Sequence, residues 1–116
     1  MAILGFVITR TFSAGQGSDA LMALAGSALA KGDFVRVFLC FDGVYQAISN
    51  QRSVEGQSSQ SAWIDALRFA GADVTASHAC MEARGLHIDE LHPGVRTCIM
   101  EELSELIGIS DKVVCL

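Results

Sequence analysis

The chain has 116 residues, of which 51% are hydrophobic and 18% charged, and its formal net charge is −5. This length suits one domain with a proper core, and the acidic balance without any Lys/Arg run argues against a nucleic-acid scaffold. The start, Met1 to Ile8, lacks the basic region of a signal peptide and is too short to span a membrane, so we expect a soluble, cytoplasmic protein.

The first part of the chain predicts a strand, a helix and a second strand. Residues 2–9 are a near-continuous apolar run, which is typical of a strand buried on both faces. After a loop of small polar residues, Ser18 or Asp19 can cap a helix that ends at Gly32. Residues 34–41 form the second buried strand, and the chain turns directly after it.

The second part continues the same alternation. Residues 49–61 are polar, rich in serine and glutamine and without periodicity, so we expect a mobile segment there. Helical spacing of apolar residues predicts helices over 62–70 and 95–107. Strands are predicted over 72–77 and 112–116.

Strands that alternate with helices favour a mainly parallel sheet with helices on both faces. In such sheets, sites form beyond the carboxyl ends of the strands. Residues 9–17, 41–45 and 78–85 each follow a predicted strand, so we expect them to converge at that edge.

Several polar motifs have a plain structural reading beside a functional one. Gly15-Gln16-Gly17 precedes a helix like a phosphate-binding turn, but it lacks the full glycine pattern and the P-loop lysine, which favours an ordinary turn. Ser13 and Ser18 lack the G-x-S-x-G setting of a serine hydrolase. The other polar candidates, for which solvated or structural positions are the commoner role, are Glu82, His87, Asp89, Glu90 and His92.

Four cysteines are present, without the paired spacing of a disulfide framework and without a C-x-x-C zinc pattern. Cys40 and Cys115 lie in predicted strands and resemble small buried apolar residues. Cys98 falls in the predicted helix 95–107 and could be structural or reactive. Cys80 differs from the other three because it ends a strand close to a cation, Arg84.

A reactive Cys80 would need help to form a thiolate at neutral pH, from positive charge or from backbone N–H groups. Arg84 and the turn from strand to helix could supply both. His78 would lie on the same face as Cys80 if the segment stays extended, and could then act as its base or merely line the site. On these grounds alone, a reactive and a structural Cys80 are about equally supported.

The segment Cys80-Met-Glu-Ala-Arg-Gly-Leu resembles part of the carboxyl half of the DsrE/DsrF/TusD sulfur-relay family. The same resemblance continues through the blocks Asp89-Glu90-Leu91, Gly94-Val95, 100–103 and 110–114. In the amino half, residues 38–45 are similar to the family's second strand and its G-V-Y turn, and residues 17–32 to its first helix.

This resemblance implies a single flavodoxin-like α/β domain over residues 1–116 that assembles into trimers or hexamers. It also implies that Cys80 carries sulfur as a persulfide, with no metal or organic cofactor, because each step is thiol exchange. In the TusD and DsrE branches, a TusA-like carrier donates the sulfur and a DsrC/TusE-like protein accepts it. The pathways are tRNA thiolation and dissimilatory sulfur oxidation.

The chain departs from the family pattern at three places. Many relatives carry C-x-x-C-x-D-A-R-G, whereas Ser77 stands at the first cysteine position here, so a resolving thiol is missing from the motif. The spacing from Cys80 to the Arg-Gly pair is shorter than in the TusD branch, and residues 11–15 replace the usual Pro-Tyr-Gly type of turn. The alternative function is a non-catalytic oligomeric assembly or small-ligand-binding subunit in which Cys80 is incidental.

Overall fold

The computed structural model describes residues 2–10, 16–48 and 62–116. Five parallel strands form one sheet in the order β4-β3-β2-β1-β5. The strands are β1 (Ile3–Ile8), β2 (Phe34–Leu39), β3 (Asp73–Ser77), β4 (Arg96–Cys98) and β5 (Lys112–Cys115). The helices are α1 (Gln16–Ala30), α2 (Ala62–Phe69), α3 (His78–Ala83) and α4 (Met100–Ile109), and the 3-10 turns are η1 (Phe41–Ala47) and η2 (Ile88–Glu90).

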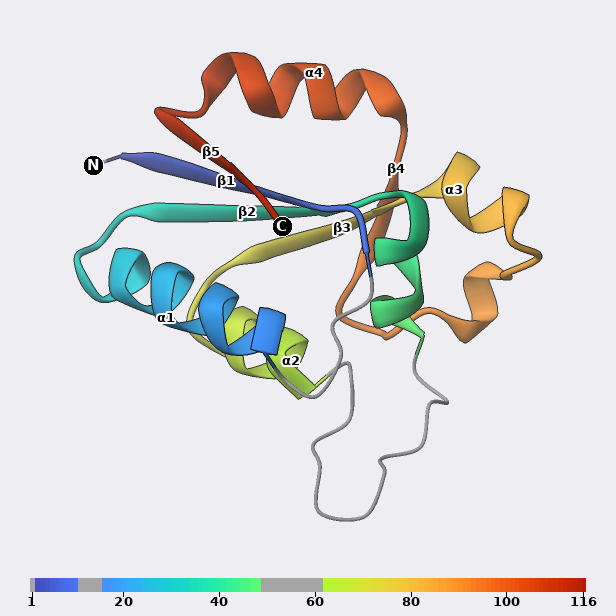
Figure 1. Ribbon diagram of the computed structural model, residues 1–116, viewed down its shortest axis with the longest axis horizontal. Coiled ribbons are helices and arrows are strands. Elements are labelled where there is room, and N and C mark those ends of the chain that lie inside the picture. Colours follow the sequence, from blue (N-terminus) through green and yellow to red (C-terminus); the bar gives the residue numbers. More distant parts are fainter. Residues whose placement is uncertain (1, 11–15, 49–61) are drawn as a thin grey trace.

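The expected fold class, a parallel α/β sheet covered on both faces, is confirmed. Helices α1 and α2 lie on one face of the sheet and α4 lies on the other, while α3 stands at its carboxyl edge (Figure 1). Strand β5 pairs with the edge of β1 that faces away from β2. In the flavodoxin strand order, this edge position is occupied by the second strand of the chain.

Side chains that alternate along the strands fill two separate cores, since successive residues of a strand point to opposite faces. Against α1 and α2 lies the larger core, which includes Phe6, Ile8, Val37 and Leu39. Under α4 lies a smaller buried cluster, which we call the α4-side cluster: Val7, Phe38, Cys40, Cys98 and Leu106. The central strands β1, β2 and β3 are therefore buried on both faces over most of their length, as their apolar runs predict.

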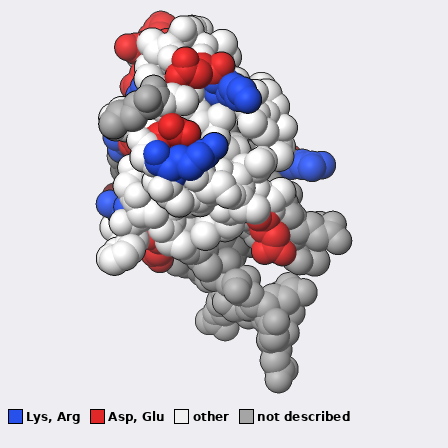
Figure 2. Space-filling view, turned by 90° about the vertical axis from the view of Figure 1, so that its left-hand side faces the viewer, with Lys and Arg blue, Asp and Glu red and all other residues white. Residues whose placement is uncertain are grey.

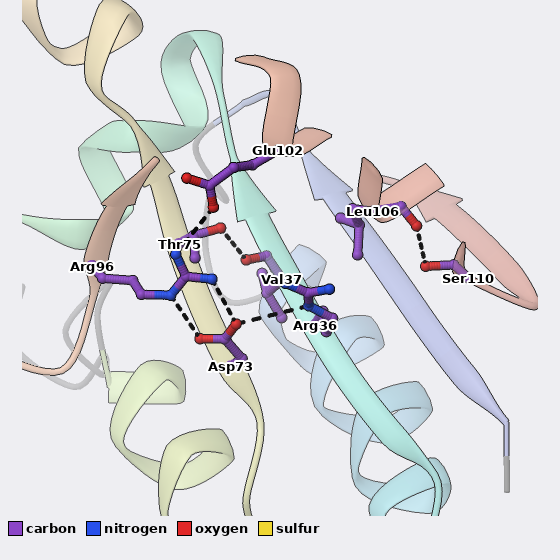
Figure 3. A network of polar contacts seen from close by, with 8 residues as sticks. All are labelled: Arg36, Val37, Asp73, Thr75, Arg96, Glu102, Leu106 and Ser110. Atoms are coloured by element: carbon purple, nitrogen blue, oxygen red, sulfur yellow. Dashed lines mark hydrogen bonds and ion pairs between the residues drawn. The ribbon is translucent and has the colours of Figure 1, made fainter. Parts of the chain in front are cut away.

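The predicted helix over 95–107 is wrong at its start, because Arg96–Cys98 form the edge strand β4 and the helix begins at Met100. The Arg96 guanidinium bonds both carboxylate oxygens of Asp73 on β3, at 3.4 and 3.1 Å, and also reaches Glu102 on α4 at 3.1 Å (Figure 3). Arg36 on β2 lies 3.8 Å from the same aspartate. These partners are distant in sequence, so helical spacing could not reveal them.

The other predicted elements agree with the structure to within two or three residues. Helix α1 begins at Gln16, two residues before the expected cap at Ser18. Gly32 and Gly71 lie just past α1 and α2 with φ of +87° and +108°, as expected of helix-ending glycines. The predicted mobile segment 49–61 lies outside the described residues, as do residues 11–15.

The surface at the amino ends of the strands carries charges of both signs beside one another (Figure 2). Within the described ranges, no helix has the length and apolar character needed to cross a bilayer.

A close approach of backbone to backbone fixes where the chain goes after β2. A Cβ placed on Gly43, in η1, would collide with the carbonyl group of Ile8 at the end of β1. The chain can therefore turn at residues 42–43, as expected, and continue as η1 against the sheet edge only because this residue has no side chain.

We expect Gly43→Ala to lower the free energy of unfolding by about 3 kcal/mol, because backbone atoms cannot move aside as a flexible side chain can. Gly26→Ala is the matched control, since Gly26 lies inside α1 with open space around its Cα, and it should stabilise by about 0.5–1 kcal/mol. Chemical denaturation measures both, and equal effects of the two changes would contradict the close approach.

Candidate functional site

Cys80 lies in the first turn of α3, which starts directly at the end of β3 without a loop. Ser77 is the helix cap, and its hydroxyl oxygen accepts the Cys80 backbone N–H at 3.3 Å. The thiol is half-buried, between the core and solvent. The backbone of Cys80 is thus fixed by a hydrogen bond to the side chain of Ser77.

Gly85 ends helix α3. Its φ is +69°, and the Gly85 and Leu86 amides bond the carbonyls of Glu82 and Met81, which is the Schellman arrangement. The helix therefore stops after six residues. Arg84 is the C-cap, the residue directly after the helix, and its side chain faces back toward the sheet edge.

Arg84 joins α3 to the segment that follows β2. Its Nε lies 2.9 Å from Oδ1 of Asp42, and its Nη1 donates to the backbone carbonyl of Cys80 at 3.2 Å. Phe41, just before Asp42, has φ of +51°, a strained conformation for a bulky residue. The expected convergence of residues 41–45 with 78–85 is confirmed by these contacts.

His78 does not share a face with Cys80. The segment is helical rather than extended, and the His78 ring lies 3.1 Å from the carboxylate of Glu82, one turn ahead, with both side chains largely exposed. Residues two apart in a helix point to different sides. The condition on which His78 could serve as a base for the thiol is therefore not met.

The remaining polar candidates lie apart from Cys80 or outside the described residues. His92 is buried, with its Nε2 2.8 Å from Asp65 and its Nδ1 accepting the Gly94 amide, so it fastens a loop to α2. Glu90 accepts the His87 amide at 3.1 Å in the η2 turn. Asp89 is exposed, and the side chains of Ser13, Gln16 and Ser18 are not among those described.

Of the other three thiols, Cys115 contradicts the expected burial, whereas Cys40 agrees with it. Cys115 is exposed rather than buried, because it ends the edge strand β5. Cys98 is buried in β4 and its thiol donates to the Ala76 carbonyl at 3.5 Å, so of its two possible roles the structural one fits. Cys40 is buried, as expected, with 1% of its surface exposed.

Sequence reasoning missed that Cys40 lies close to Cys80. Cys40 comes directly after β2, and α3 comes directly after the neighbouring strand β3. The turn η1, which begins at the residue after Cys40, packs against α3. Cys80 packs against the α4-side cluster, to which Cys40 and Cys98 belong. The available signal was that each cysteine stands at or just past the carboxyl end of a strand, where neighbouring parallel strands converge.

Exposed apolar side chains stand near the thiol. Phe41 and Ile99 are 54% and 56% exposed, and Met100 is 44% exposed. Met100 reaches the start of α3, since its sulfur lies 3.7 Å from the Ser77 hydroxyl. The sheet edge at which α3 begins thus carries an apolar rim, the kind of surface that proteins offer to other proteins.

Residues 2–116 match the family model of the DsrE/DsrF-like family. The chain belongs to this family. Membership covers nearly the whole sequence, and it confirms the resemblance carried by the Cys80 to Leu86 segment. The family is associated with sulfur relay.

Two archaeal relatives support the assignment. The chain is 30% identical over 96 residues to the uncharacterized protein MK0008 of Methanopyrus kandleri, covering 80% of this chain and 76% of that protein. It is 30% identical over 108 residues to the uncharacterized protein MJ0989 of Methanocaldococcus jannaschii, covering 93% and 94% of the two chains.

Two solved structures share the fold. The ychN protein from E. coli superposes with a TM-score of 0.83 at 20% identity, over 100% of this chain and 99% of that one. MTH1491 from Methanobacterium thermoautotrophicum, a protein of unknown function, gives 0.72 at 15% identity over the whole of both chains. At these identities the likeness is one of fold.

Burial raises the pKa of the Cys40 thiol from its ordinary value of 9.0 to about 11. Since the folded value lies above the unfolded one, the neutral thiol stabilises the fold below pH 9, and this contribution is lost as pH rises through 11. We expect Cys40→Ala to remove about 2–3 kcal/mol of the alkaline loss of stability. Urea denaturation between pH 8 and 11 measures it, and an unchanged pH dependence in the variant would contradict it.

Proposed function

We propose that this protein is a sulfur carrier, which holds sulfane sulfur as a persulfide on Cys80 and passes it to an acceptor thiol. The observation that carries the proposal is the setting of Cys80 in a chain of a sulfur-relay family: a half-buried thiol in the first turn of α3, at the carboxyl edge of the sheet. A partner's thiol can reach such a sulfur, while the protein shields the rest of it.

The chemistry is two successive thiol exchanges. The Cys80 thiolate attacks the outer sulfur of a donor persulfide, and the donor's own sulfur leaves as a thiolate. An acceptor thiolate then attacks the outer sulfur of Cys80–S–SH and frees the Cys80 thiolate. Neither step calls for a metal ion or an organic cofactor.

Arg84 is proposed to favour the anionic sulfur and to hold α3 in place. Its guanidinium bonds the Cys80 carbonyl and the Asp42 carboxylate, and its side chain is only 22% exposed. Because Asp42 offsets part of its charge, the pair supports positioning at least as much as electrostatic activation.

The partners proposed are a TusA-like donor and a DsrC/TusE-like acceptor, in sulfur oxidation or tRNA thiolation in the cytoplasm. The apolar rim of Phe41, Ile99 and Met100 supports a protein partner over a small free thiol, since it would be covered on docking.

We expect wild-type protein incubated with a carrier-bound or thiosulfate-derived persulfide to become one or more sulfur atoms heavier by intact mass. Reductant should remove the added sulfur, because a persulfide is exchangeable. Cys80→Ser should gain none, while Cys115→Ser, which removes an exposed thiol, should load like wild type. Equal loading of Cys80→Ser would favour the alternative, a non-catalytic assembly or ligand-binding subunit.

The same assay tests Arg84. We expect Arg84→Ala to load more slowly and to react more slowly with iodoacetamide at pH 7, with Arg84→Lys intermediate, because lysine keeps the charge but loses the forked contact. Melting temperatures of both variants control for lost packing. Wild-type rates in Arg84→Ala would assign activation to other groups.

We also propose that the protein forms a trimer or hexamer. Large apolar side chains lie open on the outer surfaces of several elements, among them Phe34, Phe69 and Ile107, with Phe69 96% exposed. A chain this small gains by covering them against copies of itself. Light scattering with size-exclusion chromatography measures the mass, and a stable monomer at micromolar concentration would overturn the proposal.

A further inference from the structure

Two buried thiols stand at the carboxyl ends of strands on either side of β3. In the sheet register Leu39 of β2 lies opposite Ala76, and Ser77 lies opposite Cys98 of β4. Cys40, the residue after Leu39, therefore comes level with Ser77 and Cys98 at the sheet edge. Both cysteines belong to the α4-side cluster, against which Cys80 packs.

Cys40 and Cys80 are also tied together through their neighbours. Arg84 bonds the Cys80 carbonyl with one nitrogen and Asp42, two residues after Cys40, with another. After burial, the largest influence on the Cys40 pKa is the charge of Cys80, ahead of that of Cys115, Cys98 and Arg84. Packing and ion pairing thus hold the two cysteines at the same part of the sheet edge.

The two buried thiols, Cys40 and Cys98, differ in their hydrogen bonding. The Cys98 thiol donates to the Ala76 carbonyl. Cys40 makes no side-chain hydrogen bond to any part of the chain that the structure describes. Cys40 can therefore turn toward Cys80 without giving up a polar contact, whereas Cys98 cannot.

We propose that Cys40 is a resolving thiol built into this protein, which discharges a loaded Cys80 by forming a Cys40–Cys80 disulfide. This inference rests on the proposed function. The segment from Ser77 to Cys80 contains no second thiol, so the resolving thiol would come from the residue after β2. The product is a closed state that cannot accept sulfur again until a dithiol reductant opens it.

The step balances without an added oxidant. The Cys40 sulfur attacks the inner sulfur of Cys80–S–SH, a Cys40–Cys80 bond forms, and the bond to the outer sulfur breaks. The outer sulfur leaves as hydrosulfide and takes up the Cys40 proton, so hydrogen sulfide is released. The Cys40 sulfur is oxidised and the departing sulfur is reduced to the sulfide level.

Discharge by Cys40 is expected to be slower than delivery to an acceptor. Cys40 is 1% exposed and holds its proton at neutral pH, so its reactive thiolate is scarce. A docked acceptor would take the sulfur first, and the disulfide would form when no acceptor arrives. Cys40 then protects against a long-lived persulfide that could load wrong targets.

The test follows loaded protein after the donor is removed, with no acceptor present. Wild type is expected to lose the added sulfur, to release sulfide, and to end two hydrogen atoms lighter than the reduced protein, with Cys40 and Cys80 cross-linked in peptide maps. Cys40→Ser and Cys40→Ala should load normally but keep the persulfide at least about tenfold longer. Cys98→Ser, from the same cluster, and Cys115→Ser should discharge like wild type.

A second arm is independent of persulfide. The protein used is Cys115→Ser, which lacks the exposed thiol that would compete for the reagent. One equivalent of dithiobis(nitrobenzoate) places a thionitrobenzoate leaving group on Cys80. Attack by Cys40 should then release a second coloured thiolate, and adding Cys40→Ser should abolish this release. Release in this arm, without sulfur loading in the first, would sink the carrier function and keep the thiol pair. Absence of the second release, wild-type discharge in Cys40→Ser, or sulfur that moves intact onto Cys40 would each overturn the inference.

Discussion

The parallel register of β2 against β3 is the constraint on which the site depends. Leu39 lies opposite Ala76, so the chain leaves both strands at the same level of the sheet edge. The two exits, η1 and α3, are then neighbours, and Arg84 can reach Asp42 across them. A shift of one residue in β2 would turn Cys40 to the opposite face of the sheet, away from the α4-side cluster.

Ser77 fixes the first turn of the helix that carries Cys80. A serine hydroxyl is a strong helix cap, and here it binds the amide of Cys80 itself. A thiol is a weaker acceptor and would cap poorly. The serine thus gives α3 a firm first turn, and the two thiols of the cluster against which Cys80 packs come from β4 and from the residue after β2.

Burial, rather than residue type, separates the four cysteines. Cys40 and Cys98 are enclosed, and burial is the main cause of the raised pKa of each. Cys80 is half-buried and Cys115 is open to solvent. Because exposure and thiolate formation govern the reactivity of a thiol, the four cysteines differ in chemical accessibility within a single small sheet.

The sequence by itself determined the fold class, four of the five strands and the family, because long apolar runs, helix-ending glycines and the Cys80 to Leu86 segment are local signals. It could not determine β4, since three residues carry too little periodicity and become a strand by pairing with β3. Likewise, the helical path that separates His78 from Cys80, the exposure of Cys115 and the nearness of Cys40 to Cys80 were decided only by tertiary structure. Each of these depends on which residues distant in the chain become neighbours, and strand order and register settle that through contacts that no local pattern contains.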